Sequence, residues 1–555
     1  MKRIKIWGSL DPFFEAGAAL GRRQANAQFM EFLLREDPFD RYDFFLKGAG
    51  GEPELKRQLD EVDPPPWREG RIRLRSRLEL PDAVGREAYH CFHLSDCIVH
   101  PAPLAGLRNA RSLAVFPITS VTHSLSYAHY HEAFLRHLSP TTTPRDCVAG
   151  TSRTAVQALE AFYGRLRRDY RLPEREFPAP VVRRMPLGVD ASFLRPAPPE
   201  KKARLRERLG ISSETCCFLV FGRISHQSKM DIVPLLRALQ RLINQGARRE
   251  SLHLVAAGWA DDEDSYPRQL TELAASLGLP FSLIKRPPEA EKLRIYQAAD
   301  VFVSIADNPQ ETFGLTVLEA QAAGLPVVAS DYDGYKDLVD HEGAGLLVET
   351  LGPRETDLID LLAPLTFGNQ HHLLLAQQTA VSTPALAAAL GRLLADPDLR
   401  RSMGEAGRRR VEKEFSWPGI IHRWVELWDE LQNAVVDREA LRSTRHPMAL
   451  PYADVFAGYP TRALGPDVPL LATRTGQAIR RGKDNVVLYA LLEPFLRIDA
   501  LDKLVFLARK PITAGAAVDR LVEMVDDMTR EQAWMTLRWA VKQDLLEPTD
   551  SSDEP

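Results

Sequence analysis

Residues 300–334 read DVFVSIADNPQETFGLTVLEAQAAGLPVVASDYDG, and this stretch decides the fold. Its first part, Val301–Ser304, is a nearly all-apolar run, as in a strand that is covered on both faces. The turn-forming residues 307–309 then predict a loop. Apolar residues recur at helical spacing over 315–323, and a second apolar run begins at 327. The stretch therefore predicts one β-α-β unit.

Two carboxylates give this unit chemical interest. Glu311 ends the loop just before the predicted helix, where Thr312 is a possible N-cap and backbone N–H groups point outward. Glu319 lies inside the apolar stripe of the helix, and a buried carboxylate needs donors such as sugar hydroxyls. A salt-bridged helix glutamate and a solvated loop glutamate are the ordinary alternative. Both carboxylates and Gly314 nevertheless converge on the end of the sheet where open α/β sheets bind ligands.

Two cations are expected at the same end of the sheet. The apolar run Cys216–Phe221 predicts the first strand of a second sheet, and Arg223 and Lys229 follow it in the strand-to-helix loop. Two fixed cations in such a loop hold a diphosphate and stabilise it as it departs with its charge. The alternative is a pair of solvated loop cations.

These residues resemble a known family. The segment Glu311-Thr-Phe-Gly-Leu-Thr-Val-Leu-Glu319, followed by Ala-x-Ala-x-Gly-x-Pro-Val-Val, resembles the paired-glutamate signature of retaining GT-B glycosyltransferases of the family 4 type, the glycosyl transferases group 1. The resemblance implies that Glu319 binds the ribose of a nucleotide sugar and that Glu311 binds the donor sugar. It also implies that the backbone from Phe313 to Leu315 approaches the diphosphate or the sugar. Arg223 and Lys229 match the family's cation pair.

The N-terminal half resembles the family more diffusely. The run from Phe116 to His123 is similar to a family segment in which a strand delivers a histidine toward the donor sugar, so His123 is a candidate. A lone histidine is more often a structural residue. The comparison also raises Gly17, in the loop after the predicted first strand, as a candidate donor contact, against the alternative of an ordinary loop.

The β-α alternation predicts an α/β protein with open parallel sheets. The resemblance implies two Rossmann-like domains that face a cleft, the GT-B arrangement, and the C-terminal residues predict a small, mainly helical appendage. We expect domains at 1–180 and 181–431, a linker with irregular structure at 432–484, and a helical bundle, winged-helix-like, at 485–548. The first sheet should draw strands from five short runs: Ile4–Trp7, Asp43–Leu46, Ile72–Leu74, Cys97–His100 and Leu113–Phe116.

Composition restricts the function classes. The 555 residues are 45% hydrophobic and 26% charged with a net charge of −4, which gives no reason to expect binding to nucleic acid or to an anionic membrane. The five cysteines lack metal-ligand spacing and read as buried thiols of a reducing compartment. No apolar run is long enough for a membrane span, and the N-terminus lacks the apolar core of a signal peptide. We therefore expect a cytoplasmic protein.

The sequence gives little support for a metal site. Asp331-Tyr-Asp333 spells a metal–nucleotide motif of another glycosyltransferase class, but it follows the strand after the paired-glutamate helix, which is not the context of that motif. Residues 350–384 depart from the family and read as an inserted loop, where His371 and His372 are too few for a metal site. We expect no metal and no cofactor beyond the donor.

The resemblance implies a hexosyltransferase-type enzyme that transfers a sugar from a nucleotide diphosphate donor, with retention of configuration and without a metal. The acceptor stays open among a glycan, a lipid-linked sugar and a protein or peptide. Two alternatives remain: another GT-B reaction such as nucleotide-sugar epimerisation, and a non-catalytic scaffold that binds nucleotide sugars.

Overall fold

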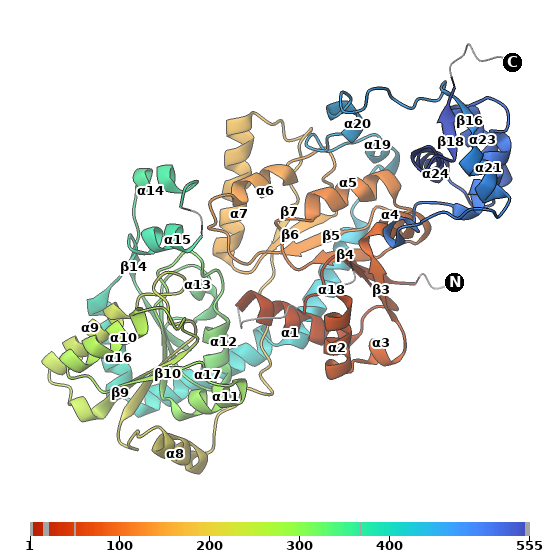
Figure 1. The fold of residues 1–555 in the computed structure, drawn as a ribbon. Coiled ribbons are helices and arrows are strands. Elements are labelled where there is room, and N and C mark those ends of the chain that lie inside the picture. The colour runs from red at the N-terminus through yellow and green to blue at the C-terminus, as the bar shows by residue number, and fades with distance from the viewer. Residues whose placement is uncertain (1–3, 15–20, 49–50, 367, 550–555) are drawn as a thin grey trace. The chain divides into compact units, whose positions relative to one another are not determined.

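The computed structural model describes residues 4–14, 21–48, 51–366 and 368–549. The chain divides into two compact units, Met1–Pro447 and Met448–Pro555 (Figure 1). Each unit has a hydrophobic core of its own. Among the described residues, no helix has both the length and the apolar character that crossing a membrane requires.

The first domain is built on a parallel sheet with seven strands in the described residues, in the spatial order β3-β2-β1-β4-β5-β6-β7. The strands are β1 (Ile6–Ser9), β2 (Arg41–Leu46), β3 (Ile72–Ser76), β4 (Cys91–Leu94), β5 (Ile118–Val121), β6 (Asp146–Gly150) and β7 (Val181–Arg184). Such an order, which grows outward from β1 in both directions, is that of a doubly wound nucleotide-binding sheet.

Helices connect these strands, as parallel pairing requires. They are α1 (Gly21–Glu36), α2 (Glu52–Val62), α3 (Pro65–Arg68), α4 (Leu80–Arg86), α5 (Pro101–Arg111), α6 (Tyr130–His137) and α7 (Arg153–Tyr170). The side chain of Ser152 caps α7 by accepting a hydrogen bond from the backbone N–H of Ala155 at 3.0 Å.

Two expected strands of this sheet are wrong. Cys97–His100 and Leu113–Phe116 are irregular, and the strands lie at β4 and β5 instead. Val99 and Leu113 are 51% and 44% exposed, so these apolar runs do not enter the sheet. The first sheet also continues past the expected boundary at 180, because β7 pairs with β6.

The second domain repeats the pattern, with six parallel strands described in the order β10-β9-β8-β11-β12-β13. The strands are β8 (Cys216–Phe221), β9 (Leu252–Gly258), β10 (Phe281–Lys285), β11 (Val301–Ser304), β12 (Val327–Ser330) and β13 (Gly345–Val348). The helices are α8 (Pro199–Arg208), α9 (Val233–Asn244), α10 (Tyr266–Ser276), α11 (Glu289–Ala298), α12 (Leu315–Ala322), α13 (Tyr335–Leu338), α16 (Thr383–Ala395) and α17 (Pro397–Glu414). The predicted strand Cys216–Phe221 and the predicted β-α-β unit are present as β8 and as β11, α12 and β12.

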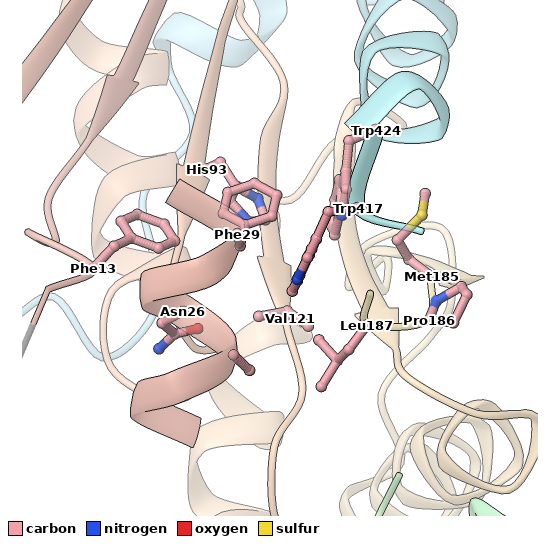
Figure 2. A pocket seen from close by; sticks show the side chains of 11 residues that line it. Phe13, Asn26, Phe29, His93, Val121, Met185, Pro186, Leu187, Trp417 and Trp424 are labelled. Atoms are coloured by element: carbon pink, nitrogen blue, oxygen red, sulfur yellow. The ribbon is translucent and has the colours of Figure 1, made fainter. Parts of the chain in front are cut away.

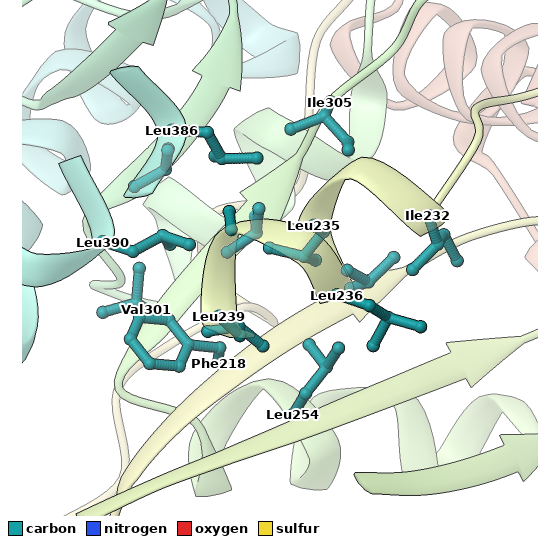
Figure 3. Close-up of a cluster of buried hydrophobic side chains, with 14 of the residues drawn as sticks. Phe218, Ile232, Leu235, Leu236, Leu239, Leu254, Val301, Ile305, Leu386 and Leu390 are labelled. Atoms are coloured by element: carbon teal, nitrogen blue, oxygen red, sulfur yellow. The ribbon is translucent and has the colours of Figure 1, made fainter. Parts of the chain in front are cut away.

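One face of this sheet is covered by α9 and α16. Leu235 and Leu239 of α9 pack with Leu386 and Leu390 of α16 over Phe218, in a fully buried cluster (Figure 3). This apolar layer holds the sheet rigid, so the loops at the carboxyl ends of its strands have a fixed base.

The expected inserted loop at 350–384 is structured. It consists of an antiparallel pair, β14 (Thr350–Leu351) and β15 (Ala380–Val381), that encloses α14 (Asp357–Leu362) and α15 (Asn369–Ala376). His372 is buried, and its Nε2 lies 2.8 Å from Ser126 Oγ of the first domain. The insertion therefore contacts both domains of the first unit.

The last long helix of the first unit, α18 (Trp417–Asn433), returns to the first domain. Trp417, Trp424 and Trp428 of this helix are buried in the same cluster as Phe29 of α1. A mainly apolar pocket lies between α1, α18 and the domain connection 185–187 (Figure 2). A short helix, α19 (Arg438–Arg442), follows and packs on α5.

The second unit is mainly helical, as expected, and also contains a small sheet. The described strands pair antiparallel in the order β17-β16-β18. Its elements are α20 (Tyr452–Val455), β16 (Pro469–Ala472), α21 (Arg474–Arg480), α22 (Leu501–Leu507), β17 (Ile512–Thr513), α23 (Ala514–Met524), α24 (Arg530–Lys542) and β18 (Leu546–Pro548). Since β16 and α21 fall in the expected linker 432–484, that segment is partly folded. A winged-helix arrangement stays a prediction.

Candidate active site

Three segments of the second domain meet beyond the carboxyl ends of its central strands. The loop after β8 carries Arg223 and Lys229, the loop after β11 carries Glu311, and α12 begins directly after Gly314. The parallel strands β8 and β11 are neighbours in the sheet, so these two loops leave it side by side. This is the edge at which doubly wound sheets bind ligands.

Glu311 and Lys229 are in direct contact through Oε2 and Nζ, with side chains 12% and 16% exposed. The Tyr335 hydroxyl lies 3.4 Å from the same carboxylate oxygen. Burial, followed by the repulsion of Arg223, lowers the pKa of Lys229 to about 8. Burial also lowers the pKa of the Arg223 guanidinium, which is partly buried. Two cations thus lie close together, one of them in contact with a carboxylate.

The start of α12 adds backbone donors to this point. Gly314 is the N-cap in a left-handed conformation with φ of 105°, so the helix begins at Leu315 and Thr312 does not cap it. A Cβ at Gly314 would lie 2.3 Å from Cε1 of Tyr335, so only glycine fits. Phe313 is 3% exposed and anchors the turn in the core. The free N–H groups of α12 favour an anion here.

Glu319, in the middle of α12, is 4% exposed. Among the described residues it receives three donors: Lys292 Nζ at 2.6 Å and Gln24 Nε2 at 3.2 Å on Oε1, and the Tyr296 hydroxyl at 3.1 Å on Oε2. The sequence predicted that this carboxylate needs donors but did not identify them. Gln24 comes from α1 of the first domain, so Glu319 lies where the two domains meet.

His123 follows β5 of the first domain. Its Nε2 donates to the backbone oxygen of Ser95 at 2.8 Å, and burial lowers the pKa of His123 to about 4, so the imidazole is neutral at pH 7. The next residue, Ser124, donates to the backbone oxygen of Gln310 at 2.9 Å. The histidine loop therefore contacts the loop that carries Glu311.

Two further sequence candidates have different outcomes. Gly17 lies outside the described residues. Asp333 accepts a hydrogen bond at 2.7 Å from Thr154 of the first domain, and burial raises its pKa to about 6. Asp331 and Asp333 belong to no group of three or more potential metal ligands, and no such group occurs within the described ranges.

Sequence reasoning missed several residues at this site. Gln310 Nε2 donates to the Tyr127 hydroxyl at 2.7 Å, and the ring of His372 lies edge-on to Tyr127 with centroids 4.7 Å apart. Lys292 lies in a charged helix that reads as solvated. None of these residues belongs to a spacing pattern, because each reaches the site through packing between distant segments.

Comparison with known proteins finds similar sequences over part of the chain. Residues 201–363 match the family model described as glycosyl transferases group 1. The D-inositol 3-phosphate glycosyltransferase of Saccharomonospora viridis is 31% identical over 258 residues, 46% of this chain and 51% of that protein. The protein of the same name from Kineococcus radiotolerans is 34% identical over 269 residues, 48% of this chain and 54% of that protein. The chain thus spans about half the length of the curated relatives it matches.

Solved structures resemble a larger share of the chain. A glycosyltransferase of Rickettsia africae has a TM-score of 0.53 at 16% identity, over 78% of this chain and 100% of that chain. The Anabaena protein HepE, solved in complex with UDP, has a TM-score of 0.51 at 16% identity, over 77% of this chain and 100% of that chain. At this identity the likeness concerns the fold. The chain therefore has the GT-B fold of two Rossmann-like domains, and its residues 201–363 are similar to the glycosyl transferases group 1.

Proposed function

We propose that this chain is a retaining glycosyltransferase that moves a hexosyl unit from a nucleotide diphosphate sugar to an acceptor hydroxyl. The observation that carries the proposal is the cluster of Arg223, Lys229 and Glu311 at the start of α12, inside the segment that matches the family. Two neighbouring cations and a helix N-terminus suit a diphosphate. The carboxylate between them suits the hydroxyls of a donor sugar.

The chemistry follows from the charges. The bond between the sugar C1 and the diphosphate oxygen breaks, and the electron pair leaves with the diphosphate. Arg223, Lys229 and the N–H groups of α12 stabilise that developing charge. The acceptor oxygen attacks C1 from the same face, and its proton passes to a phosphate oxygen of the leaving group. Glu311 is engaged by Lys229, which favours this course over a carboxylate nucleophile.

The roles of the remaining candidates fit this scheme. Glu319 would bind the ribose, the backbone from Phe313 to Leu315 would approach the diphosphate, and the neutral His123 would face the donor sugar. The acceptor is a glycan, a lipid-linked sugar, a protein or peptide, or a small polyol phosphate. Because two relatives carry the name D-inositol 3-phosphate glycosyltransferase, D-inositol 3-phosphate is the first acceptor to test.

A thermal-stabilisation screen of UDP, GDP and ADP sugars tests the donor. A ligand at about 100 times its Kd adds about 2.7 kcal/mol to the free energy of unfolding.

Replacing both Arg223 and Lys229 by Ala should abolish transfer and leave the fold intact. The control replaces Lys201 and Arg237, both exposed, by Ala and should retain activity. A double variant that still transfers sugar would refute the proposed role of the cations, and product formation without an acceptor would indicate epimerisation.

We also propose that Arg223, Lys229 and the start of α12 replace a divalent ion. Turnover should therefore persist in excess EDTA. The measurement is the transfer rate with EDTA and after addition of Mg²⁺ or Mn²⁺. Complete loss of transfer in EDTA, restored by either ion, would contradict metal-independent transfer. Asp331 and Asp333 would then be the first candidates for a metal site.

A further inference from the structure

The carboxylate of Glu319 is held by two residues of a neighbouring helix. Lys292 and Tyr296 lie one turn apart on α11, and both reach Glu319 on α12, at 2.6 Å and 3.1 Å. Lys292 is 6% exposed, so the ion pair is almost fully removed from water. Because the charges of a buried ion pair lose their hydration, such a pair adds little net stability over apolar residues. Its presence at the ligand end of the sheet points to a role in binding.

The third donor to Glu319 differs from these two. Gln24 is neutral, its Nε2 lies at the longer distance of 3.2 Å, and its side chain is partly exposed. It also comes from α1 of the first domain, whereas Lys292 and Tyr296 belong to the same domain as Glu319. A hydrogen bond with these properties can exchange with a ligand at lower cost than the buried ion pair.

The number of acceptor positions on the carboxylate of Glu319 indicates which ligand it can bind. A carboxylate has about four acceptor positions. Lys292 and Tyr296 occupy two of them from a fixed helix, which leaves two once Gln24 withdraws. Two acceptor positions on one carboxylate match the two neighbouring hydroxyls of a ribose.

We infer that Lys292 and Tyr296 are positioning residues that hold Glu319 ready for the ribose of the donor, and that a ribose hydroxyl replaces the amide of Gln24. The inference rests on the proposed function, since it concerns the nucleotide of the same donor. It adds that selection for ribose over deoxyribose depends on Lys292, a residue that does not itself need to touch the sugar.

The test measures the Kd values of UDP, GDP and ADP and of their 2′-deoxy counterparts by calorimetry on the full chain. The wild type should prefer the ribonucleotide by about 10-fold to 100-fold, the value of a hydrogen bond to a charged group. K292M should lose most of this preference, and K292R should regain it. A role of Lys292 in folding alone would leave the ratio of the two Kd values unchanged.

K292M leaves the buried carboxylate of Glu319 without its ion-pair partner and can therefore unfold the protein, so the test includes a second variant. K292M/E319Q removes both charges together and should fold while showing no ribose preference. K201M, a lysine on the exposed side of α8, is the matched control and should keep the wild-type ratio. A folded K292M/E319Q that still prefers ribose would overturn the inference.

Gln24 is tested by Q24A, which should bind the ribonucleotide about 3-fold to 10-fold more tightly because no amide competes for Glu319. Weaker binding would mean that Gln24 contacts the nucleotide itself, and the exchange would be refuted. Failure of the proposed function has a different signature, namely a wild type that binds none of the three diphosphates. A wild type that binds one of them without preferring ribose would refute only the inference.

Discussion

Lys229 is a lysine whose charge changes within the pH range of ordinary assays. Its pKa is lowered to about 8, first by burial and then by Arg223, so the folded protein loses this positive charge as the pH rises through 8. Diphosphate binding that uses the charge should weaken in the same window. We expect the Kd of the bound nucleotide to rise about tenfold between pH 7 and pH 9.

The matched variant for this prediction is K229R, because an arginine stays protonated throughout. Any titration of the nucleotide itself affects both proteins equally, so the comparison isolates Lys229. Isothermal calorimetry at pH 7, 8 and 9 gives both curves. A Kd that is independent of pH in the wild type would remove Lys229 from the diphosphate site.

The sequence predicted the positions of residues that lie together in one short segment. Glu311 directly precedes α12 and Glu319 lies on it, so their places in the loop and the helix could be read from one short segment. The partner of Glu319 was not predictable in this way. Gln24 is 295 positions away from Glu319, and only the packing of two domains joins them.

At the scale of elements, the N-terminal turn of α12 makes a prediction about Gly314. Alanine there would need a left-handed backbone and would clash with the ring of Tyr335. G314A should therefore lower the free energy of unfolding by about 1–3 kcal/mol. It should also weaken nucleotide binding, because the N–H groups at the start of α12 would shift.

The control is G352A, at an exposed glycine where a Cβ would have open space. Chemical denaturation gives the free energies, and calorimetry with UDP, GDP and ADP gives the affinities. An unchanged affinity in a folded G314A would argue that the helix start does not touch the ligand.

The strands of the two domains differed in how well the sequence predicted them. In the second domain, the central strands β8, β11 and β12 are almost entirely apolar, so they read directly as buried strands. In the first domain, β4 contains His93, which looked polar. Its ring packs on Trp424 with centroids 4.5 Å apart, and burial lowers its pKa to about 3. Strand β4 can be buried because α18, which is distant in the sequence, packs against the neutral ring of His93. The local sequence pattern does not show this contact.

At the scale of the whole molecule, the division at Pro447 predicts that residues 1–447 fold alone. Arg442 and Thr444 still make hydrogen bonds to the first domain, so the cut lies after them rather than near Leu431. The truncated chain should bind nucleotide with unchanged Kd and hydrolyse donor slowly. Melting temperature and calorimetry check this, and aggregation of the fragment would show that the second unit is required for the fold.

The same unit should lose stability in acid. His93 and His137 are fully buried, with pKa values lowered to about 3 and about 4. An unfolded chain takes up these protons below its ordinary histidine pKa of about 6.5 and the folded chain does not, so stability falls as the pH drops through this window. At pH 5 each histidine should remove about 2 kcal/mol. Urea unfolding of residues 1–447 at pH 7 and pH 5 checks the sign, and equal midpoints would contradict it.

The return of α18 to the first domain has a consequence for synthesis on the ribosome. The first domain is complete in sequence at Arg184, yet the tryptophans that cover its α1 face begin at Trp417. Roughly 230 residues must be translated in between, which takes about 10–50 s. During that interval the nascent first domain presents an uncovered apolar face, so this face is the place where a chaperone would hold the growing chain.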